Sequence, residues 1–518
     1  MLLPRSAFLP NLAYLAFLVA VSLPLAAQQL LVPPYVQPGE LATLDARDEK
    51  IIAWLTDQTP GDFTVEFSVT SLTAPSSDSA AASAASSSRT ATPTRTVLDL
   101  SATQHFYKYA APLRDLPFDA TVTYRVKLAG RVLHEAAFAT RKSRAQPVRF
   151  AVTGDAAAGR PDARKIADAI AAARPDHLLI AGDIVYSRGL VSEYAAKFWP
   201  VYNRAAPTGP ALLASTVLYA VLGNHDAGVT RLPELPGDAG IATFDTYPDS
   251  LAAFYFFHAP RNGPPALTRP PADAKFAATR EKLAAVTHPG FLPVIGPADK
   301  VAAFQAAAGA TYPALCHYSF DSGPVHFLVL DSNRFTDPRD PLLTAWIRRD
   351  LTASRAPWKT VFFHHPGFNA SLKHNAEQTA RHWSPLFEAC GVDVVFSGHV
   401  HNYQRTHPLR FAPAADAPAK GLIPGAFTLD AKFDGITRTV PAGIIYLVTG
   451  GGGAGLYDTE LTGHPEKYKF NPGEPNYIAR FISDRHSFTL VEATTQTLTI
   501  RQLDPTGTEL DRLKITHR

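Results

Sequence analysis

Apolar residues along this chain fall into short runs that end at turn-forming and polar residues. Runs rich in β-branched, aromatic and leucine residues end just before residues 154, 182, 223, 364 and 398. Such runs, bounded by turn signals, predict buried strands. Further strands are expected at residues 325–330, 488–493 and 497–501, and the last two should close a second sheet.

Between these runs, apolar positions recur at helical spacing. In residues 162–173 the apolar face is Ile166, Ala169, Ile170 and Ala173, and in residues 341–355 it is Leu342, Leu343, Trp346 and Ile347. Strands that alternate with helices predict an α/β sandwich for residues 148–518.

Residues 30–145 follow a different pattern. Short runs near residues 50–55, 63–69, 106–109 and 121–128 mostly alternate apolar and polar positions, which predicts a β-sandwich. Within it, residues 71–96 are rich in Ser, Ala and Thr and should form a long solvated hairpin loop. Residues 141–147 would then be a short linker.

Residue types that bind metals follow the strand-like runs. Asp155, Asp183, Asn224, His364 and His399 each come directly after such a run or its terminal glycine. Ligands in open α/β sheets gather at the carboxyl ends of strands, so these side chains should meet. Oxygen and nitrogen donors without thiolate suit Fe, Mn and Zn. Two ions about 3.5–4 Å apart are a common arrangement for activating water against phosphorus, and Asp183 could bridge them.

These blocks resemble the calcineurin-like metallophosphoesterases, and Tyr186 makes them similar to the purple acid phosphatases. The family pattern is GDxG, GDxxY, GNH(D/E), VxxH and GHxH. The second, third and fifth blocks are intact, and residues 361–364 fit the fourth. The first is looser, because its second glycine comes late, at Gly159. Over residues 30–518, the resemblance implies an αββα sandwich metallophosphoesterase domain (148–518) after a fibronectin type III-like β-sandwich (30–145).

The resemblance also implies two metal ions and their ligands. The first ion would be held by Asp155, Tyr186 and His401, the second by Asn224, His364 and His399, and Asp183 would bridge them. A phenolate ligand implies Fe(III) at the tyrosine site, with Zn, Mn or Fe(II) at the second site. His365 is adjacent to His364 and is the alternative ligand.

The activity implied by the resemblance is acid phosphatase-like hydrolysis of phosphomonoesters. A metal-bound hydroxide would attack phosphorus directly, with no phosphoenzyme. Candidate catalytic residues are His225, Asp226 and His374. His225, next to Asp226, could bind phosphate or protonate the leaving group, and His374 resembles a substrate-facing histidine of the family. The alternatives are a phosphodiesterase of the same superfamily and a non-enzymatic extracellular binding protein with a vestigial metal domain.

The long connection between the third block and residue 318 could affect specificity. Its aromatic residues 254–257 and Arg261 could line a substrate entrance, with Arg261 on phosphate. The alternative is a packed covering loop. The glycine run at residues 450–453 lacks the lysine and hydroxyl residue of a phosphate-binding P-loop and is interpreted as a turn near the site.

Composition narrows the expected partners. The 518 residues carry a net charge of +3 at a pI near 8.6, too mild to indicate nucleic acid or anionic membrane. The resemblance implies a small-molecule phosphate ester as the partner. Cys316 and Cys390 could pair or remain two buried thiols.

The first residues are typical of an export signal. Arg5 precedes an apolar stretch over residues 12–23, and small residues follow before Gln28. This predicts a signal peptide over residues 1–27 and a secreted or periplasmic protein without a stable membrane anchor after cleavage. The alternative is an uncleaved anchor, although the stretch is short for a bilayer.

Overall fold

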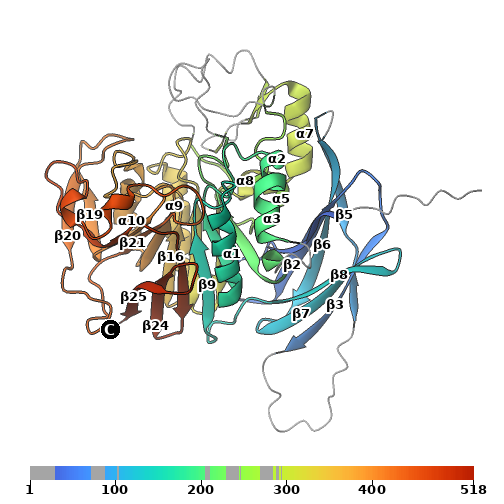
Figure 1. Cartoon of the computed structure of the whole chain (residues 1–518), viewed down its shortest axis with the longest axis horizontal. Coiled ribbons are helices and arrows are strands. Elements are labelled where there is room, and N and C mark those ends of the chain that lie inside the picture. The colour runs from blue at the N-terminus through green and yellow to red at the C-terminus, as the bar shows by residue number, and fades with distance from the viewer. Residues whose placement is uncertain are drawn as a thin grey trace, which may run out of the picture.

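The computed structural model describes residues 30–71, 88–101, 104–204, 211–228, 244, 247–268, 284–286, 291–292 and 294–517. The expected signal peptide lies outside these residues, as do residues 72–87 of the expected loop. Figure 1 shows a β-sandwich of N-terminal strands beside a larger α/β part that carries the later strands.

The N-terminal part is a sandwich of two antiparallel sheets, as predicted. One sheet has the order β1 (Leu30–Pro38), β2 (Asp48–Thr56), β6 (Gln104–Leu116), β5 (Thr94–Ser101), and the other β4 (Arg89–Ala91), β3 (Phe63–Ser71), β7 (Ala120–Leu128), β8 (Arg131–Ala139). Trp54 and Tyr109 from the first sheet pack on Phe63 from the second, with ring centroids 5.3 and 4.6 Å away. These contacts place the sandwich core between the sheets.

The prediction of a loop over residues 71–96 was wrong for its C-terminal part. Residues 89–91 and 94–96 belong to β4 and β5, and Ala91 is buried. Their threonines favour extended backbone, and pairing with β3 and β6 outweighs the low apolar content.

The first sheet of the α/β part holds the strands of the first three blocks. Its order is β11 (Val217–Val221), β10 (His177–Ala181), β9 (Val148–Thr153), β23 (Phe488–Ala493), β24 (Thr497–Leu503), β25 (Glu509–Thr516). The first three are parallel, and the tail strands continue the sheet antiparallel from β9. The prediction that the tail closes a second sheet was wrong, because β10 occupies one edge of β9 and the tail pairs with the other.

The second sheet holds the strands of the fourth and fifth blocks. Its order is β14 (His317–Ser322), β15 (Val325–Leu330), β16 (Trp358–Phe362), β17 (Val394–Ser397), β21 (Ile445–Thr449), β18 (Tyr403–Thr406), β22 (Ile478–Ile482). Phe150 of β9 contacts the rings of Phe327, Phe362 and Phe396, with centroids 4.9–6.3 Å apart. The two sheets therefore pack face to face, and the predicted α/β sandwich is confirmed.

Two helices were predicted from periodicity. α1 (Pro161–Ala173) buries Ile166 and Ile170, as expected. α9 (Pro341–Ala353) buries Leu343, Trp346, Ile347 and Leu351, but Leu342 is 46% exposed. Its assignment to the buried face was wrong, because that face continues from Leu343 through Leu351.

The remaining elements are short. The helices are α2 (Val191–Glu193), the π-helix Tyr194–Phe198, α3 (Trp199–Tyr202), α4 (Leu212–Ser215), α5 (Ala253–Phe256), α7 (Ala298–Ala308), α8 (Thr311–Ala314), α10 (Ser384–Ala389) and 3-10 turns at Thr379–Trp383, Thr459–Leu461 and Pro465–Lys467. The strand pairs are β12 (Ala284–Val286) with β13 (Val294–Gly296) and β19 (Leu409–Pro413) with β20 (Gly425–Leu429). Within the described ranges, no helix is long and apolar enough to cross a membrane.

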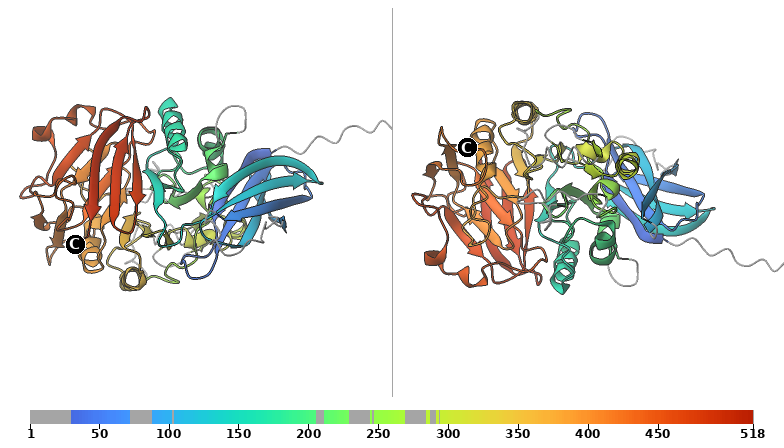
Figure 2. Two further views of the ribbon diagram at one scale, coloured as in Figure 1. Left: turned by 90° about the horizontal axis from the view of Figure 1, so that it is seen from below. Right: turned by 90° about the horizontal axis from the view of Figure 1, so that it is seen from above.

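The β-sandwich packs against described parts of the long connection. In both views of Figure 2, its blue strands lie beside green and yellow segments of the α/β part. Tyr35 on β1 donates a hydrogen bond to the carbonyl of Phe256 at 2.9 Å. Residues 254–257 are buried, and Arg261 pairs with Glu40 at 2.8 Å. Residues 254–261 are therefore packed against the sandwich, as the covering-loop alternative expects, and Arg261 serves that contact. Cys316 and Cys390 are both free and buried.

Candidate metal centre

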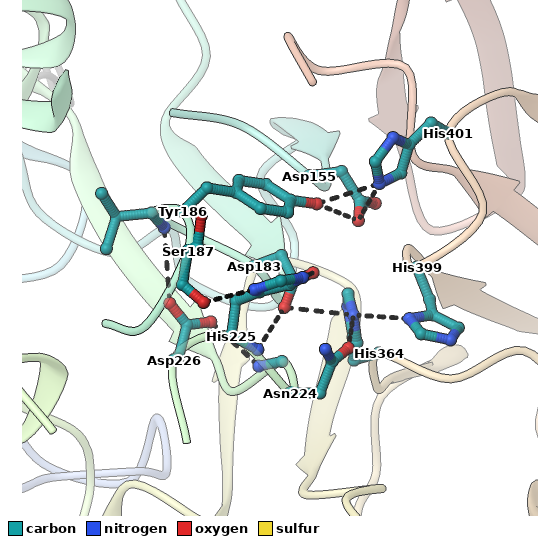
Figure 3. A network of polar contacts seen from close by, with 12 residues as sticks. Asp155, Asp183, Tyr186, Ser187, Asn224, His225, Asp226, His364, His399 and His401 are labelled. Atoms are coloured by element: carbon teal, nitrogen blue, oxygen red, sulfur yellow. Dashed lines mark hydrogen bonds and ion pairs between the residues drawn. The ribbon is translucent and has the colours of Figure 1, made fainter. Parts of the chain in front are cut away.

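Five strand ends meet between the two sheets of the α/β part. Asp155, Asp183 and Asn224 follow β9, β10 and β11, while His364 and His399 follow β16 and β17. Figure 3 shows their side chains pointing toward one another, with Tyr186 and His401 at one side. All seven predicted ligands thus lie in one cluster.

Asp155, Tyr186 and His401 form one group. The Tyr186 hydroxyl donates to Oδ1 of Asp155 at 2.8 Å and lies 3.0 Å from Nε2 of His401. The other ring nitrogen of His401, Nδ1, donates to the carbonyl of Gly455 at 2.6 Å. That bond fixes the ring so that Nε2 faces the group, as in histidines that bind metals.

Asn224, His364 and His399 form a second group. Nε2 of His364 lies 3.2 Å from Oδ1 of Asn224 and 3.2 Å from Nδ1 of His399, while its Nδ1 donates to the carbonyl of Ala181 at 2.8 Å. His365 instead contacts Ser332, with Nδ1 2.9 Å from the hydroxyl oxygen. The geometry favours His364 over His365 as the ligand.

Asp183 lies between the two groups. Its Oδ1 is 3.3 Å from Nε2 of His364, and ligand atoms of Asp155, Asp183 and His364 all lie within 4.8 Å of one another. The same Oδ1 accepts the backbone N–H of His225 at 2.9 Å. This position suits a carboxylate that bridges two ions.

Glycines let the backbone pass close to these side chains. A Cβ on Gly450 would lie 2.6 Å from Oδ2 of Asp155 and 2.3 Å from the carbonyl oxygen of Val400. The glycine run at residues 450–453 is therefore a turn packed against the centre.

The electrostatics of the cluster fit bound cations. Oδ2 of Asp155 is buried without a hydrogen-bond partner, which is costly unless something else satisfies it. Burial opposes a charge on His364, but Asp183 beside it raises the His364 pKa to about 10. Burial likewise opposes ionisation of Asp183, yet His364 and His225 hold its pKa well below its ordinary value. Two buried carboxylates, Asp155 and Asp183, thus face one site, and a bound cation would take the place of the proton that Asp183 favours on His364.

Comparison with known proteins agrees with this geometry. A family model described as Calcineurin-like phosphoesterase matches residues 148–403. Residues 148–403, which contain all seven predicted ligands, therefore resemble the calcineurin-like phosphoesterase family. The resemblance inferred from the sequence motifs is thereby confirmed, and the family implies a two-metal centre.

Individual relatives match shorter stretches. Purple acid phosphatase 18 of Arabidopsis thaliana is 36% identical over 99 residues, 17% of this chain and 22% of that protein. Purple acid phosphatase 13 of the same plant is 28% identical over 154 residues, 29% of this chain and 24% of that protein. The matches therefore span only about a quarter of these relatives.

Solved structures also match, over longer stretches than these relatives. Purple acid phosphatase PPD1 from yellow lupin (Lupinus luteus) superposes with a TM-score of 0.58, covering 93% of this chain and 74% of that one at 16% identity. At this identity, the likeness shows a shared fold.

The candidate catalytic residues differ in how they lie relative to the candidate metal centre. His225 borders the centre, with its ring 4.4 Å from that of Tyr186 and its Nδ1 bonded to the carbonyl of Ser187 at 2.5 Å. Asp226 is buried and accepts the backbone N–H groups of Ile184 and Gly223 at 3.0 and 2.9 Å. It holds the loops that carry Asp183 and Asn224, which is a structural position.

His374 reaches the centre from the loop after β16. Its ring lies 4.0 Å from that of His399, and its Nδ1 bonds Oε1 of Glu377 at 2.8 Å. Glu377 also bonds Nε2 of His399 at 2.8 Å. Sequence reasoning missed Glu377, although its spacing of three from His374 was a usable signal. Tyr457, stacked on His401 at 3.9 Å, was missed because it lies in a loop without a motif.

Proposed function

We propose that this chain is a metal-dependent phosphomonoesterase of the acid phosphatase type, with two ions held by Asp155, Asp183, Tyr186, Asn224, His364, His399 and His401. The observation that carries the proposal is Asp183, whose carboxylate lies between two groups of donors from five strand ends. When bound, the ions would supply an activated water and neutralise charge on the phosphate.

Side chains around the centre would bind the phosphate and protonate the leaving group. Nδ1 of His225 is engaged by the Ser187 carbonyl, and a carbonyl only accepts, so this nitrogen donates. Nε2 of His225, 3.8 Å from Oδ2 of Asp183, is left to face a phosphate oxygen. His374, on the opposite side beside His399, is the second candidate to bind phosphate or protonate the leaving oxygen.

The proposal extends to the ions and the location. Phenolate ligation by Tyr186 supports Fe(III) in the first group, and imidazole and amide donors support Zn, Mn or Fe(II) in the second. The signal-like residues 1–27 support export, in a secreted or periplasmic form. The β-sandwich of residues 30–145 is proposed to be fibronectin type III-like, ahead of a catalytic domain over residues 148–518.

Hydrolysis of an aryl phosphomonoester and of the matching diester tests the function. We expect the metal-loaded protein to turn over the monoester faster, and Asp183→Ala to abolish turnover with loss of bound metal. Asp416→Ala, on an exposed carboxylate, is the matched control and should leave both unchanged. Preference for the diester would favour a phosphodiesterase, and no turnover of either ester by fully loaded protein would contradict the proposal.

A further inference from the structure

The carboxylate of Glu377 bonds both a candidate metal ligand, His399, and a candidate phosphate-binding residue, His374. Oε2 of Glu377 lies 2.8 Å from Nε2 of His399 and Oε1 lies 2.8 Å from Nδ1 of His374. The His399 side chain is only 7% exposed, whereas Glu377 is 49% exposed. A half-exposed group therefore holds both a buried candidate ligand and a histidine that faces the substrate side.

The hydrogen-bond chemistry fixes both rings. An ionised carboxylate can only accept, so Nε2 of His399 and Nδ1 of His374 must both donate. For His399, this leaves the lone pair on Nδ1, the atom that lies 3.2 Å from Nε2 of His364 in the second group. For neutral His374, it places the lone pair on Nε2. Glu377 thus sets which nitrogen of each ring is free.

The backbone holds this arrangement in register. His374 has a φ of +57°, and its carbonyl accepts the N–H of Glu377 at 3.1 Å. The Asn375 side chain donates to the carbonyls of Asn369 and Lys469 at 3.0 and 2.9 Å. The turn is therefore tied at both sides, and the three-residue spacing of His374 and Glu377 is built in.

We propose that Glu377 is a positioning residue that couples the second metal site to phosphate binding. It orients His399 toward the ion and, by accepting from Nδ1, holds His374 so that the imidazolium form of the ring can donate from Nε2 to a phosphate oxygen. Since carboxylates behind metal-binding histidines raise affinity and fix ring orientation, one substitution should affect both events. This inference rests on the proposed function for the role of His374.

The test compares Glu377→Ala and Glu377→Gln with Glu466→Gln. Glu466 also bonds a histidine, His464 Nδ1 at 3.0 Å, but on an exposed pair. In chelator competition with Zn²⁺, we expect Glu377→Ala to weaken one of two ions by about 10–100-fold and leave the other unchanged. Inorganic phosphate should bind the loaded variant more weakly by calorimetry, and the control should match the wild type.

The glutamine variant separates positioning from simple loss of structure. Its carbonyl can still accept from His399, while its amide can only donate to Nδ1 of His374. We expect near wild-type Zn²⁺ affinity but a reversed His374 tautomer, seen in the ¹⁵N shifts of the zinc-loaded protein. Wild-type affinity for both ions in Glu377→Ala, or an unchanged tautomer in Glu377→Gln, would overturn the proposal.

A histidine variant, combined with Glu377→Ala, completes a double-mutant cycle. In His374→Ala, phosphate binding should weaken while Zn²⁺ affinity stays at the wild-type level, and adding Glu377→Ala should then lower only the metal affinity. A further fall in phosphate affinity, measured with both sites saturated by Zn²⁺, would contradict the coupling through His374. These readouts do not depend on turnover, so an inactive protein that shows them would retain the coupling and lose the proposed function.

Discussion

Gly182 lies directly against His364. A Cβ on Gly182 would meet Nδ1 of His364 at 2.2 Å and its Cβ at 2.7 Å. Gly182 also has a φ of +84°, a conformation that only glycine adopts at low cost. The strand end that presents Asp183 is therefore shaped by the side chain of another candidate ligand.

Gly182→Ala should displace His364 and weaken metal binding. Gly130→Ala is the matched control, since Gly130 has a φ of +81° with nothing within 4 Å of its Cβ position. The control should cost about 1 kcal/mol of stability and leave bound metal unchanged. Equal metal content in both variants would show that the contact with His364 is unimportant.

Tyr186→Phe should remove colour. If Fe(III) binds the phenolate, the wild-type protein should absorb visible light by charge transfer from Tyr186, and phenylalanine cannot supply this. Tyr403→Phe is a suitable control, because Tyr403 is also buried but bonds Asp511 at 2.8 Å. An iron-loaded Tyr186→Phe protein with the wild-type absorption band would refute phenolate ligation.

His326 should stabilise the fold at acid and neutral pH. It is buried between Asp321 and Asp350, at 2.7 and 3.0 Å. Burial opposes its charge, but the bonds to both carboxylates raise its pKa to about 9, which is above the unfolded value. Its contribution is then complete below pH 6.5 and lost as pH rises through 9. Denaturation at pH 6 and pH 9.5 should show that His326→Gln costs more at pH 6, by on the order of 2–3 kcal/mol.

Lys108 should destabilise the fold at acid and neutral pH, the opposite of His326. Its Nζ is buried and lies 3.0 Å from Nε2 of His258, and within the described residues it forms no ion pair. Burial lowers its pKa to about 7, below the unfolded value, so the penalty is full below pH 7 and fades by pH 10.5. Lys108→Met should therefore raise the unfolding free energy more at pH 6 than at pH 10. An equal change at both values would mean that the lysine charge is compensated.

The metal cluster could be predicted from sequence because strand ends share an edge. Asp155, Asp183 and Asn224 follow parallel strands of one sheet, so that pattern alone brings them together, whereas His364 and His399 follow strands of the other sheet and were joined to them by the family resemblance. The pairing of the tail with β9 was not predictable, since alternation identifies a strand but not its neighbour. Glu377 was missed for a related reason, because loop geometry rather than periodicity places it on His399.

The most direct test of the account is anomalous scattering from crystals of the metal-loaded protein. Data at the iron and zinc absorption edges should give two peaks, one among Asp155, Tyr186 and His401 and one among Asn224, His364 and His399, with Asp183 between them. Two peaks about 3.5–4 Å apart would establish the binuclear centre. A single peak, or peaks away from Asp183, would contradict it.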